Sequence, residues 1–113
     1  MKVGIIGSRN FKDYKYLSEK LDDIKSEVKV VISGGAPGAD KLAEKWAIEH
    51  KKLLTIYPAD WINLGNCAGF IRNADIVKNS DMIIAFWDGK SKGTKHTIDL
   101  AKKMGKQCKI INV

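Results

Sequence analysis

Short apolar runs alternate with segments of helical periodicity along the chain, and this alternation is the feature that most limits its fold. Five runs have strand length and are rich in Val, Ile or aromatic residues: Val3–Ile6, Val28–Ile32, Leu53–Tyr57, Met82–Trp87 and Cys108–Val113. Strands that alternate with helices need crossover connections, which favour a mainly parallel sheet covered by helices. We therefore predict an α/β, Rossmann-like domain with a five-stranded, mainly parallel sheet and about four helices on both faces.

Helical spacing marks the segments between these runs. Apolar residues recur at intervals of three and four from Tyr14 and again from Ala39, which is the period of an amphipathic helix. Two further helices are predicted over Ala68–Asn79 and Thr94–Met104, the latter followed by Gly105, a residue type that commonly ends helices. Within the third helix we expect the inward side chains to be Phe70, Ile71, Ala74 and Val77.

The length and composition fit one compact domain over residues 1–113. A chain of this size buries roughly two-thirds of its unfolded surface, which is enough for a hydrophobic core without disulfides. The hydrophobic share of 44% is too high for a disordered chain, and no apolar run nears the ~20 residues that span a bilayer. The amino terminus starts like a strand and lacks the long apolar region of a signal peptide, so we expect a cytoplasmic protein without a membrane partner.

The chain carries a formal net charge of +7, from 20 Lys plus Arg against 13 Asp plus Glu. Such a charge fits binding to nucleic acid, binding to an anionic small molecule, or a lysine-coated surface with no partner. Most lysines lie on or beside the expected helices and are interleaved with acidic residues, as on a solvated face. The two arginines, Arg9 and Arg72, fall within motifs and are therefore the more informative cations.

The loops that follow the strands hold the residues of chemical interest. In doubly wound sheets, ligands bind beyond the carboxyl ends of the strands, where the winding direction reverses. Three of the four loops expected there are rich in glycine; the four are Gly7–Asn10, Ser33–Asp40, Pro58–Trp61 and Trp87–Thr94. Glycine lets the backbone approach a ligand closely, and the helix after it offers free N–H groups, a combination that suits phosphate. The alternative is that the glycines form tight turns and that Ser91 or Thr94 only caps a helix.

Two familiar enzyme motifs and a metal site are missing from the sequence. G-x-G-x-x-G and the P-loop do not occur, which argues against a standard dinucleotide dehydrogenase and a P-loop NTPase. His50 and His96 stand without a neighbouring cluster of ligand residues, and Cys67 and Cys108 form no C-x-x-C pair. We therefore expect no metal and no required cofactor, and a nucleotide-derived ligand instead.

Several motifs occur together, in order, over nearly the whole chain. They are Gly7-Ser8-Arg9, Ser33-Gly34-Gly35-Ala36, Gly38-Ala39-Asp40, Pro58-Ala59-Asp60-Trp61, Arg72-Asn73, and Trp87 with Gly89, Ser91, Gly93 and Thr94. In this set the chain resembles the SLOG superfamily, named for the Smf/DprA DNA-processing proteins and the LONELY GUY phosphoribohydrolases, and in particular its small YspA/cpYpsA-related branch. The resemblance implies a Rossmann-like domain that binds nucleotides or nucleotide-derived molecules and, in some relatives, hydrolyses an N-glycosidic bond.

We accordingly predict a ligand site on the motif residues that reach the carboxyl edge of the sheet. They are Gly7, Ser8, Arg9, Ser33, Gly34, Gly35, Ala36, Asp40, Asp60, Trp61, Arg72, Asn73, Trp87, Gly89, Lys90, Ser91, Gly93 and Thr94. Arg9 is expected to grip a phosphate with its planar guanidinium, the alternative being an ion pair with a carboxylate such as Asp40. The resemblance favours Arg72 pointing toward the ligand rather than to solvent. Trp61 and Trp87 fit a core or interface role first, although their positions at strand ends would allow stacking on a base.

One departure from the family bears on catalysis. Phosphoribohydrolase relatives carry P-G-G-x-G-T-x-x-E in the last glycine-rich loop, and the residue where that catalytic Glu would stand is Thr97. Cleavage of a glycosidic bond through an oxocarbenium-like state needs a carboxylate, which Thr97 cannot supply. Asp40, Asp60 or Asp88 could supply one from another loop, although each also fits a turn or helix-start role.

These observations rank three functions. Binding of a nucleotide or nucleotide-derived, phosphate-containing molecule, for sensing, carriage or sequestration, comes first. An N-glycosidic hydrolase acting on nucleotides comes second, because the carboxylate it needs is missing from the expected position. Single-stranded DNA binding comes third, supported only by the net charge and by aromatic residues at strand ends. The sequence leaves open whether the chain is an enzyme and whether it forms a homo-oligomer.

Overall fold

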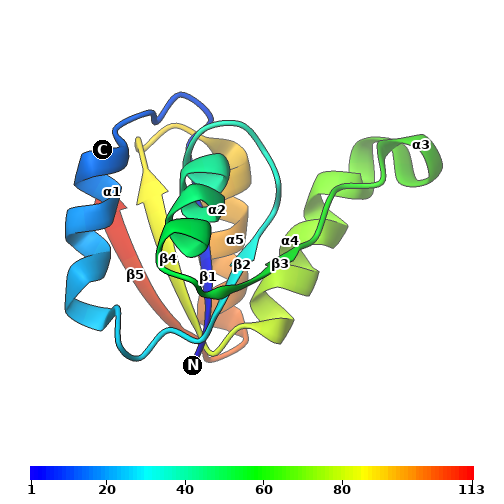
Figure 1. Ribbon diagram of the computed structural model, residues 1–113. Coiled ribbons are helices and arrows are strands. Elements are labelled where there is room, and N and C mark those ends of the chain that lie inside the picture. The colour runs from blue at the N-terminus through cyan, green and yellow to red at the C-terminus, as the bar shows by residue number, and fades with distance from the viewer.

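The computed structural model describes residues 1–113 as a five-stranded, all-parallel sheet with helices on both faces (Figure 1). The strands lie in the order β3-β2-β1-β4-β5. Their bounds are Lys2–Gly7 for β1, Val30–Ser33 for β2, Leu53–Ile56 for β3, Met82–Trp87 for β4 and Gln107–Asn112 for β5. The helices are α1 (Tyr14–Leu21), α2 (Ala39–Glu49), α3 (Trp61–Leu64), α4 (Ala68–Asn79) and α5 (Lys92–Lys103), with short 3-10 turns at Asp22–Ile24 and Gly65–Cys67.

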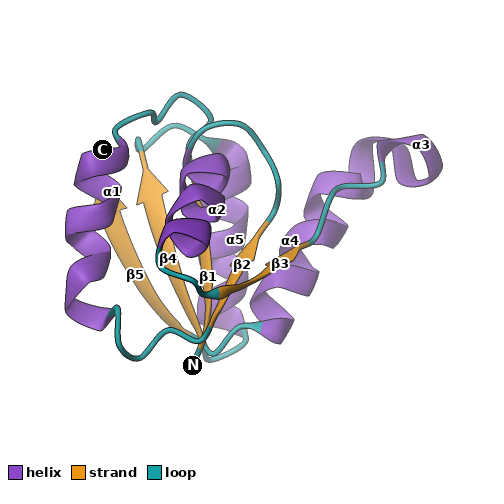
Figure 2. Cartoon of the chain, in the orientation of Figure 1, coloured by secondary structure: helices purple, strands orange, loops and turns teal.

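Two hydrophobic clusters hold the helices to the two faces of the sheet. Ile5 of β1 belongs to the cluster under α1 and α2, together with Leu17 and Trp46. The next residue, Ile6, belongs to the opposite cluster, together with Ile76 of α4 and residues of α5. Successive side chains of a strand point to opposite faces, so this central strand serves both cores. Figure 2 shows the sheet between these two helical layers.

The predicted order of strands and helices is confirmed, and the observed ends differ by small shifts. The short helix α3, between β3 and α4, was not predicted. The second strand begins at Val30 rather than Val28, because the Val28 N–H donates to the Ile24 carbonyl oxygen at 3.2 Å instead of to a neighbouring strand. The first helix ends at Leu21 and continues as a 3-10 turn through Ile24. None of the helices has the length and apolar character needed to cross a membrane.

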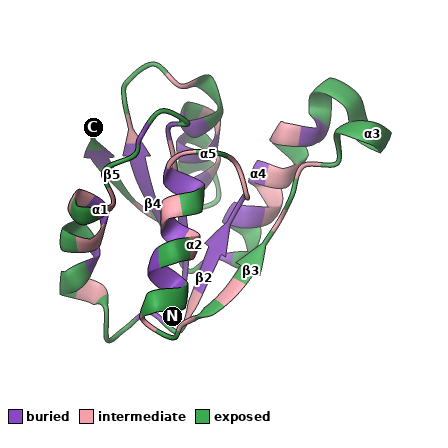
Figure 3. Ribbon diagram, turned by 45° about the horizontal axis from the view of Figure 1, so that its top comes forward, coloured by how far each residue is buried: buried purple, intermediate pink, exposed green.

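The predicted inward face of α4 is wrong in its first half. Phe70 and Ile71 are 54% and 44% exposed, whereas Asn73 and Ile76 are buried. The first turns of α4 and the whole of α3 project away from the sheet as an arm (Figure 1), and the exposed surface of α3 stands out in Figure 3. Helical periodicity identifies an apolar face, but only tertiary packing supplies something to cover it.

Gly38 holds the first two post-strand loops against each other. Its φ is +82°, and an added Cβ would lie 2.4 Å from the carbonyl oxygens of Ser8 and Arg9. The Ser8 carbonyl oxygen also accepts hydrogen bonds from the N–H groups of Phe11 and Ala39, each 3.2 Å long. A side chain at position 38 would therefore force apart the loops that start α1 and α2.

We expect Gly38→Ala to lower the free energy of unfolding by at least about 2 kcal/mol, because it combines a disfavoured φ with a backbone clash. Gly93→Ala is the matched control, since its Cβ would meet nothing within 4 Å and its backbone is helical. That variant should be neutral or slightly stabilising. Urea denaturation followed by circular dichroism measures both, and equal stability of the two variants would contradict this account.

Candidate functional site

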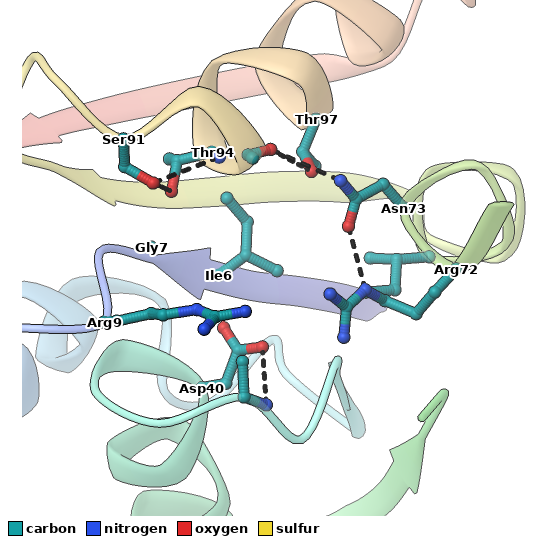
Figure 4. A pocket seen from close by; sticks show the side chains of 12 residues that line it. Ile6, Gly7, Arg9, Asp40, Arg72, Asn73, Ser91, Thr94 and Thr97 are labelled. Atoms are coloured by element: carbon teal, nitrogen blue, oxygen red, sulfur yellow. Dashed lines mark hydrogen bonds between the residues drawn. The ribbon is translucent and has the colours of Figure 1, made fainter. Parts of the chain in front are cut away.

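A pocket of about 280 Å³ opens at the carboxyl ends of β1 and β4. The chain leaves β1 toward β2 and β3 on one side and returns to β4 on the other, so this is the point where the winding reverses. Its wall, drawn in Figure 4, consists of Ile6, Gly7, Arg9, Ala36, Asp40, Arg72, Asn73, Ile76, Ser91, Gly93, Thr94 and Thr97. The pocket therefore combines an apolar floor with polar groups from three loops and from the helices α2, α4 and α5.

The loop between β4 and α5 is shaped by hydrogen bonds to one carboxylate. Asp88 Oδ1 accepts from the N–H groups of Lys90 and Ser91, each at 2.8 Å. These two bonds lower the pKa of Asp88 from its ordinary value. Trp87 Nε1 donates to the Ser91 carbonyl oxygen at 3.0 Å, and the Asp88 N–H donates to Ser8 Oγ at 3.0 Å. The side chains of Trp87, Asp88 and Ser8 thus stabilise the loop.

This loop presents the amino terminus of α5 to the pocket. Ser91 caps the helix, its Oγ lying 3.5 Å from the Thr94 nitrogen and 3.0 Å from Thr94 Oγ1. The N–H groups of Lys92 and Gly93 have no acceptor within the protein. Free N–H groups and the positive end of the helix dipole favour an anion at this position.

Arg72 connects α4 to the loop after β2. Its Nη1 donates to the Gly34 carbonyl oxygen at 2.7 Å, and its Nε donates to Asn73 Oδ1 at 3.0 Å. Asn73 Nδ2 in turn donates to the Gly93 carbonyl oxygen at 3.3 Å and lies 3.2 Å from His96 Nδ1. The side chains of Arg72 and Asn73 therefore join the loops that follow β2 and β4.

Asp40 is the buried carboxyl group of the pocket, with 5% of its surface exposed. It accepts a hydrogen bond of 3.2 Å from the Ala36 N–H. Burial raises its pKa to about 6, while that hydrogen bond and the positive charge of Arg72 act in the opposite direction. Gly34 lies against both groups: an added Cβ would be 2.7 Å from Asp40 Oδ2 and 2.8 Å from Arg72 Nη1. Glycine at position 34 therefore permits the carboxylate and the guanidinium to approach the same loop.

Arg9 is the unpaired cation of the site. Its side chain is exposed and makes neither a hydrogen bond nor an ion pair within the protein, so the alternative pairing with Asp40 does not form. Figure 4 shows its guanidinium extended across the pocket from the loop after β1. All of its N–H donors remain available to a ligand.

A second pocket, of about 330 Å³, adjoins the first. Both pockets are bordered by Arg9, Ala36 and Arg72. The rest of the second wall consists of Gly34, Gly35, Pro37, Pro58, Ala59 and Trp61. The two pockets thus form one extended site, which is polar at the α5 end and lined by proline and tryptophan side chains at the other.

The structure brings twelve of the predicted site residues to the walls of these pockets. They are Gly7, Arg9, Gly34, Gly35, Ala36, Asp40, Trp61, Arg72, Asn73, Ser91, Gly93 and Thr94. The other six, which line neither pocket, are Ser8, Ser33, Asp60, Trp87, Gly89 and Lys90. Ser33 Oγ donates to Glu44 Oε2 at 3.0 Å, and Asp60 caps α3 by accepting from the Asn63 N–H at 3.1 Å. These two side chains support the loops around the site.

The site prediction omitted six residues that line the pockets: Ile6, Pro37, Pro58, Ala59, Ile76 and Thr97. The two prolines and Ala59 belong to loops that follow strands, and this position in the sequence was the signal that could have identified them as site residues. Thr97 is buried, and its Oγ1 donates to the Gly93 carbonyl oxygen at 3.2 Å. Thr97 stands where the resemblance places the catalytic Glu of hydrolase relatives, and it offers the pocket a neutral hydroxyl.

The chain has no cluster of three His, Cys, Asp or Glu side chains arranged for a metal ion.

The sequence of this chain is similar to a known protein family and to a curated relative. The sequence model of the YspA, cpYpsA-related SLOG family matches residues 1–63. The Gene 61 protein of Mycobacterium phage D29 is 35% identical in an alignment of 113 positions, which covers 92% of this chain and 90% of that protein.

Solved structures with the same fold include two DNA processing proteins A (DprA). The protein from Streptococcus pneumoniae has a TM-score of 0.83 at 18% identity, over 99% of this chain and 50% of its own. The protein from Helicobacter pylori, described for its single-stranded DNA binding mode, has a TM-score of 0.74 at 22% identity, over 97% of this chain and 64% of its own. A third structure, TM1055, has a TM-score of 0.71 at 20% identity, over 95% of this chain and 71% of its own. This chain therefore spans between half and two-thirds of the DprA chains and shares their Rossmann-like fold.

The raised pKa of Asp40 predicts how stability depends on pH. The pKa is about 6 in the folded chain against 3.8 ordinarily, so the folded chain binds more protons between these values and its free energy of unfolding falls as pH rises through them. The fall amounts to as much as about 3 kcal/mol. We expect Asp40→Asn to flatten this slope and to be the more stable form at pH 7, because the amide oxygen can still accept from the Ala36 N–H without a buried charge.

Urea denaturation at several pH values between 4 and 7 measures this effect. Asp23→Asn, which changes an exposed carboxylate, is the matched control and should keep the wild-type slope. An Asp40→Asn slope equal to that of the wild type would show that other groups cause the pH dependence.

Proposed function

Because the chain belongs to the YspA, cpYpsA-related SLOG family, we propose that it binds a nucleotide or nucleotide-derived small molecule through a phosphate group. One observation carries this proposal: the free N–H groups at the start of α5 and the unpaired guanidinium of Arg9 lie at the same pocket. Groups that have no partner within the protein are the ones available to an anion.

The phosphate belongs in the first pocket. Gly93 lines it and has a free backbone N–H, and the Thr94 hydroxyl belongs to the same wall. The free N–H of Lys92 precedes them in the chain. Arg9 approaches from the opposite side and can give two parallel hydrogen bonds to phosphate oxygens. Asp40 is the one carboxyl group in this wall, and its raised pKa lessens the negative charge that an incoming phosphate meets near pH 6.

The remainder of the ligand belongs in the second pocket. Its wall of Pro37, Pro58, Ala59 and Trp61 offers flat, rigid apolar surface, which suits a planar base. Arg72 borders both pockets and already uses two of its nitrogens within the protein. It is therefore suited to position the part of the ligand between phosphate and base rather than to bind the phosphate. Together the two pockets fall within the roughly 300–1,000 Å³ typical of small-molecule sites.

Nucleic acid is the second candidate partner. It is favoured by the net charge of +7 and by the fold shared with DprA, including the H. pylori protein described for binding single-stranded DNA. Proteins that hold single strands combine stacking aromatics with a cationic groove. Here the exposed aromatic side chains Trp61 and Phe70 lie in a stretch without lysine, residues 53–77, which favours a small ligand over a long polyanion.

We expect nucleoside monophosphates to raise the melting temperature more than the bare nucleosides, because the phosphate contacts are lost with the latter. Arg9→Ala should weaken monophosphate binding roughly 10- to 100-fold, the value of a hydrogen bond to a charged group, without changing the fold. Lys103→Ala, which removes an exposed cation at the far end of α5, is the matched control and should bind as the wild type does.

Thermal shift and calorimetric titration measure these effects. A panel of nucleoside phosphates, ADP-ribose and cyclic nucleotides that left stability unchanged at millimolar concentration would contradict the nucleotide proposal. Sub-micromolar affinity for single-stranded oligonucleotides at physiological salt, with a steep salt dependence, would place nucleic acid first.

The neutral side chain at position 97 leads to a prediction about catalysis. We expect no appreciable release of free base from nucleoside monophosphates by the wild type, because no carboxylate occupies that position. Thr97→Glu should gain at most slow release, and Thr97→Gln, of similar size but neutral, should gain none. Chromatography of the released base is the measurement. Robust wild-type turnover that is lost in Asp40→Asn or Asp88→Asn would instead assign catalysis to another loop and make the chain a hydrolase.

A further inference from the structure

The arm formed by α3 and the start of α4 exposes five large hydrophobic side chains: Trp61, Ile62, Leu64, Phe70 and Ile71. Ile62 is 97% exposed, and α3 contains no buried residue. Figure 3 shows the arm extending from the rest of the molecule, beside the edge strand β3. A hydrophobic helix held away from its own core has no intramolecular partner that would account for its composition.

The arm also lies in a lysine-free stretch of a lysine-rich chain. Of 20 Lys plus Arg, two are the arginines Arg9 and Arg72, which leaves 18 lysines, and none of these falls between Lys52 and Lys78. The only charged residues of that stretch are Asp60, Arg72 and Asp75. Protein interfaces are depleted in lysine and enriched in aromatic side chains, whereas surfaces for nucleic acid or anionic lipid carry lysine.

The exposed apolar area of the arm matches that of a dimer interface. At roughly 200 Å² for a whole large side chain, the five side chains leave on the order of 600 Å² exposed. A standard interface takes about 800 Å² from each partner, of which about 65% is apolar in homodimers. The arm thus supplies the apolar share that one subunit of such a dimer needs.

The distribution of lysines indicates which molecule binds the arm. Two copies of a chain of net charge +7 repel each other wherever lysines meet, and the arm is where that repulsion is smallest. An acidic partner would be drawn instead to the lysine-covered helices. We propose that the arm is a homodimerisation surface, on which Ile62 and its apolar neighbours pack against the same residues of a second copy about a two-fold axis. Since Trp61 also lines the second pocket, the partner's arm would lie next to that pocket.

Light scattering after size exclusion, over micromolar to near-millimolar concentrations, tests the proposal. The wild type should approach twice the chain mass of 12.6 kDa. Ile62→Asp should shift the species toward the single-chain mass and raise the dissociation constant roughly 10- to 100-fold, as expected for a central apolar contact. Because Ile62 makes almost no contact within its own chain, its replacement should leave the circular dichroism spectrum and melting of the monomer unchanged.

Ile48→Asp is the matched control, since Ile48 is 70% exposed but lies on α2, over the other face of the sheet, and should leave the dimer intact. A second measurement uses the exposed Cys67 in the turn between α3 and α4. A bismaleimide should join two wild-type chains at this position and should fail to do so in Ile62→Asp.

Any of four results would overturn the proposal. They are a monomeric wild type over the whole concentration range, an Ile62→Asp variant that still dimerises, dissociation by Ile48→Asp to the same extent, and assembly beyond two copies. A monomer that binds a single-stranded oligonucleotide and loses that binding in Ile62→Asp would assign the arm to nucleic acid instead.

Discussion

The hydrogen bond from Arg72 to the Gly34 carbonyl oxygen connects two parts of the molecule on which the site depends. It joins α4 to the loop after β2 on the sheet edge. Asn73, the next residue of α4, extends the connection to the start of α5. Because Gly34 has no side chain, Asp40 and Arg72 can both approach this loop. The relative positions of the loops after β2 and β4 therefore depend on two side chains of α4 and on the absence of a Cβ at position 34.

This network divides the polar groups of the site into those used by the protein and those left free. Asp88, Ser33 and Trp87 use their side chains to hold the backbone of the loops. Arg9 and the first N–H groups of α5 have no such partner. Pre-organised donors that need not break an internal bond bind an anion at a lower cost in free energy. In the function that we propose, the stable loops supply the geometry, and the groups without internal partners supply the binding.

The arm shows the limit of reading burial from periodicity. Val77 and Phe70 both lie on the apolar face that spacing predicts for α4, yet only Val77 is buried. The difference comes from position along the helix: the last turns pack on β1 and α5, while the first turns extend past the sheet. Phe70 packs on one side against the ring of His96, with 4.5 Å between the ring centroids, and the rest of its surface stays exposed. The mispredicted part of α4 is therefore the part that our interface proposal uses.

Patterns in the amino-acid sequence were enough to predict the order of strands and helices, the parallel sheet, the family and the loops that line the pockets. These follow from local patterns, since periodicity and glycine placement are properties of short segments. Which loop residues face the pocket and which support it could not be predicted in this way, because that depends on partners distant in sequence, such as Gly34 for Arg72 and Ser8 for Asp88. The same holds for the pKa of Asp40 and the exposure of the arm, because burial depends on the packing of the whole chain rather than on any one segment.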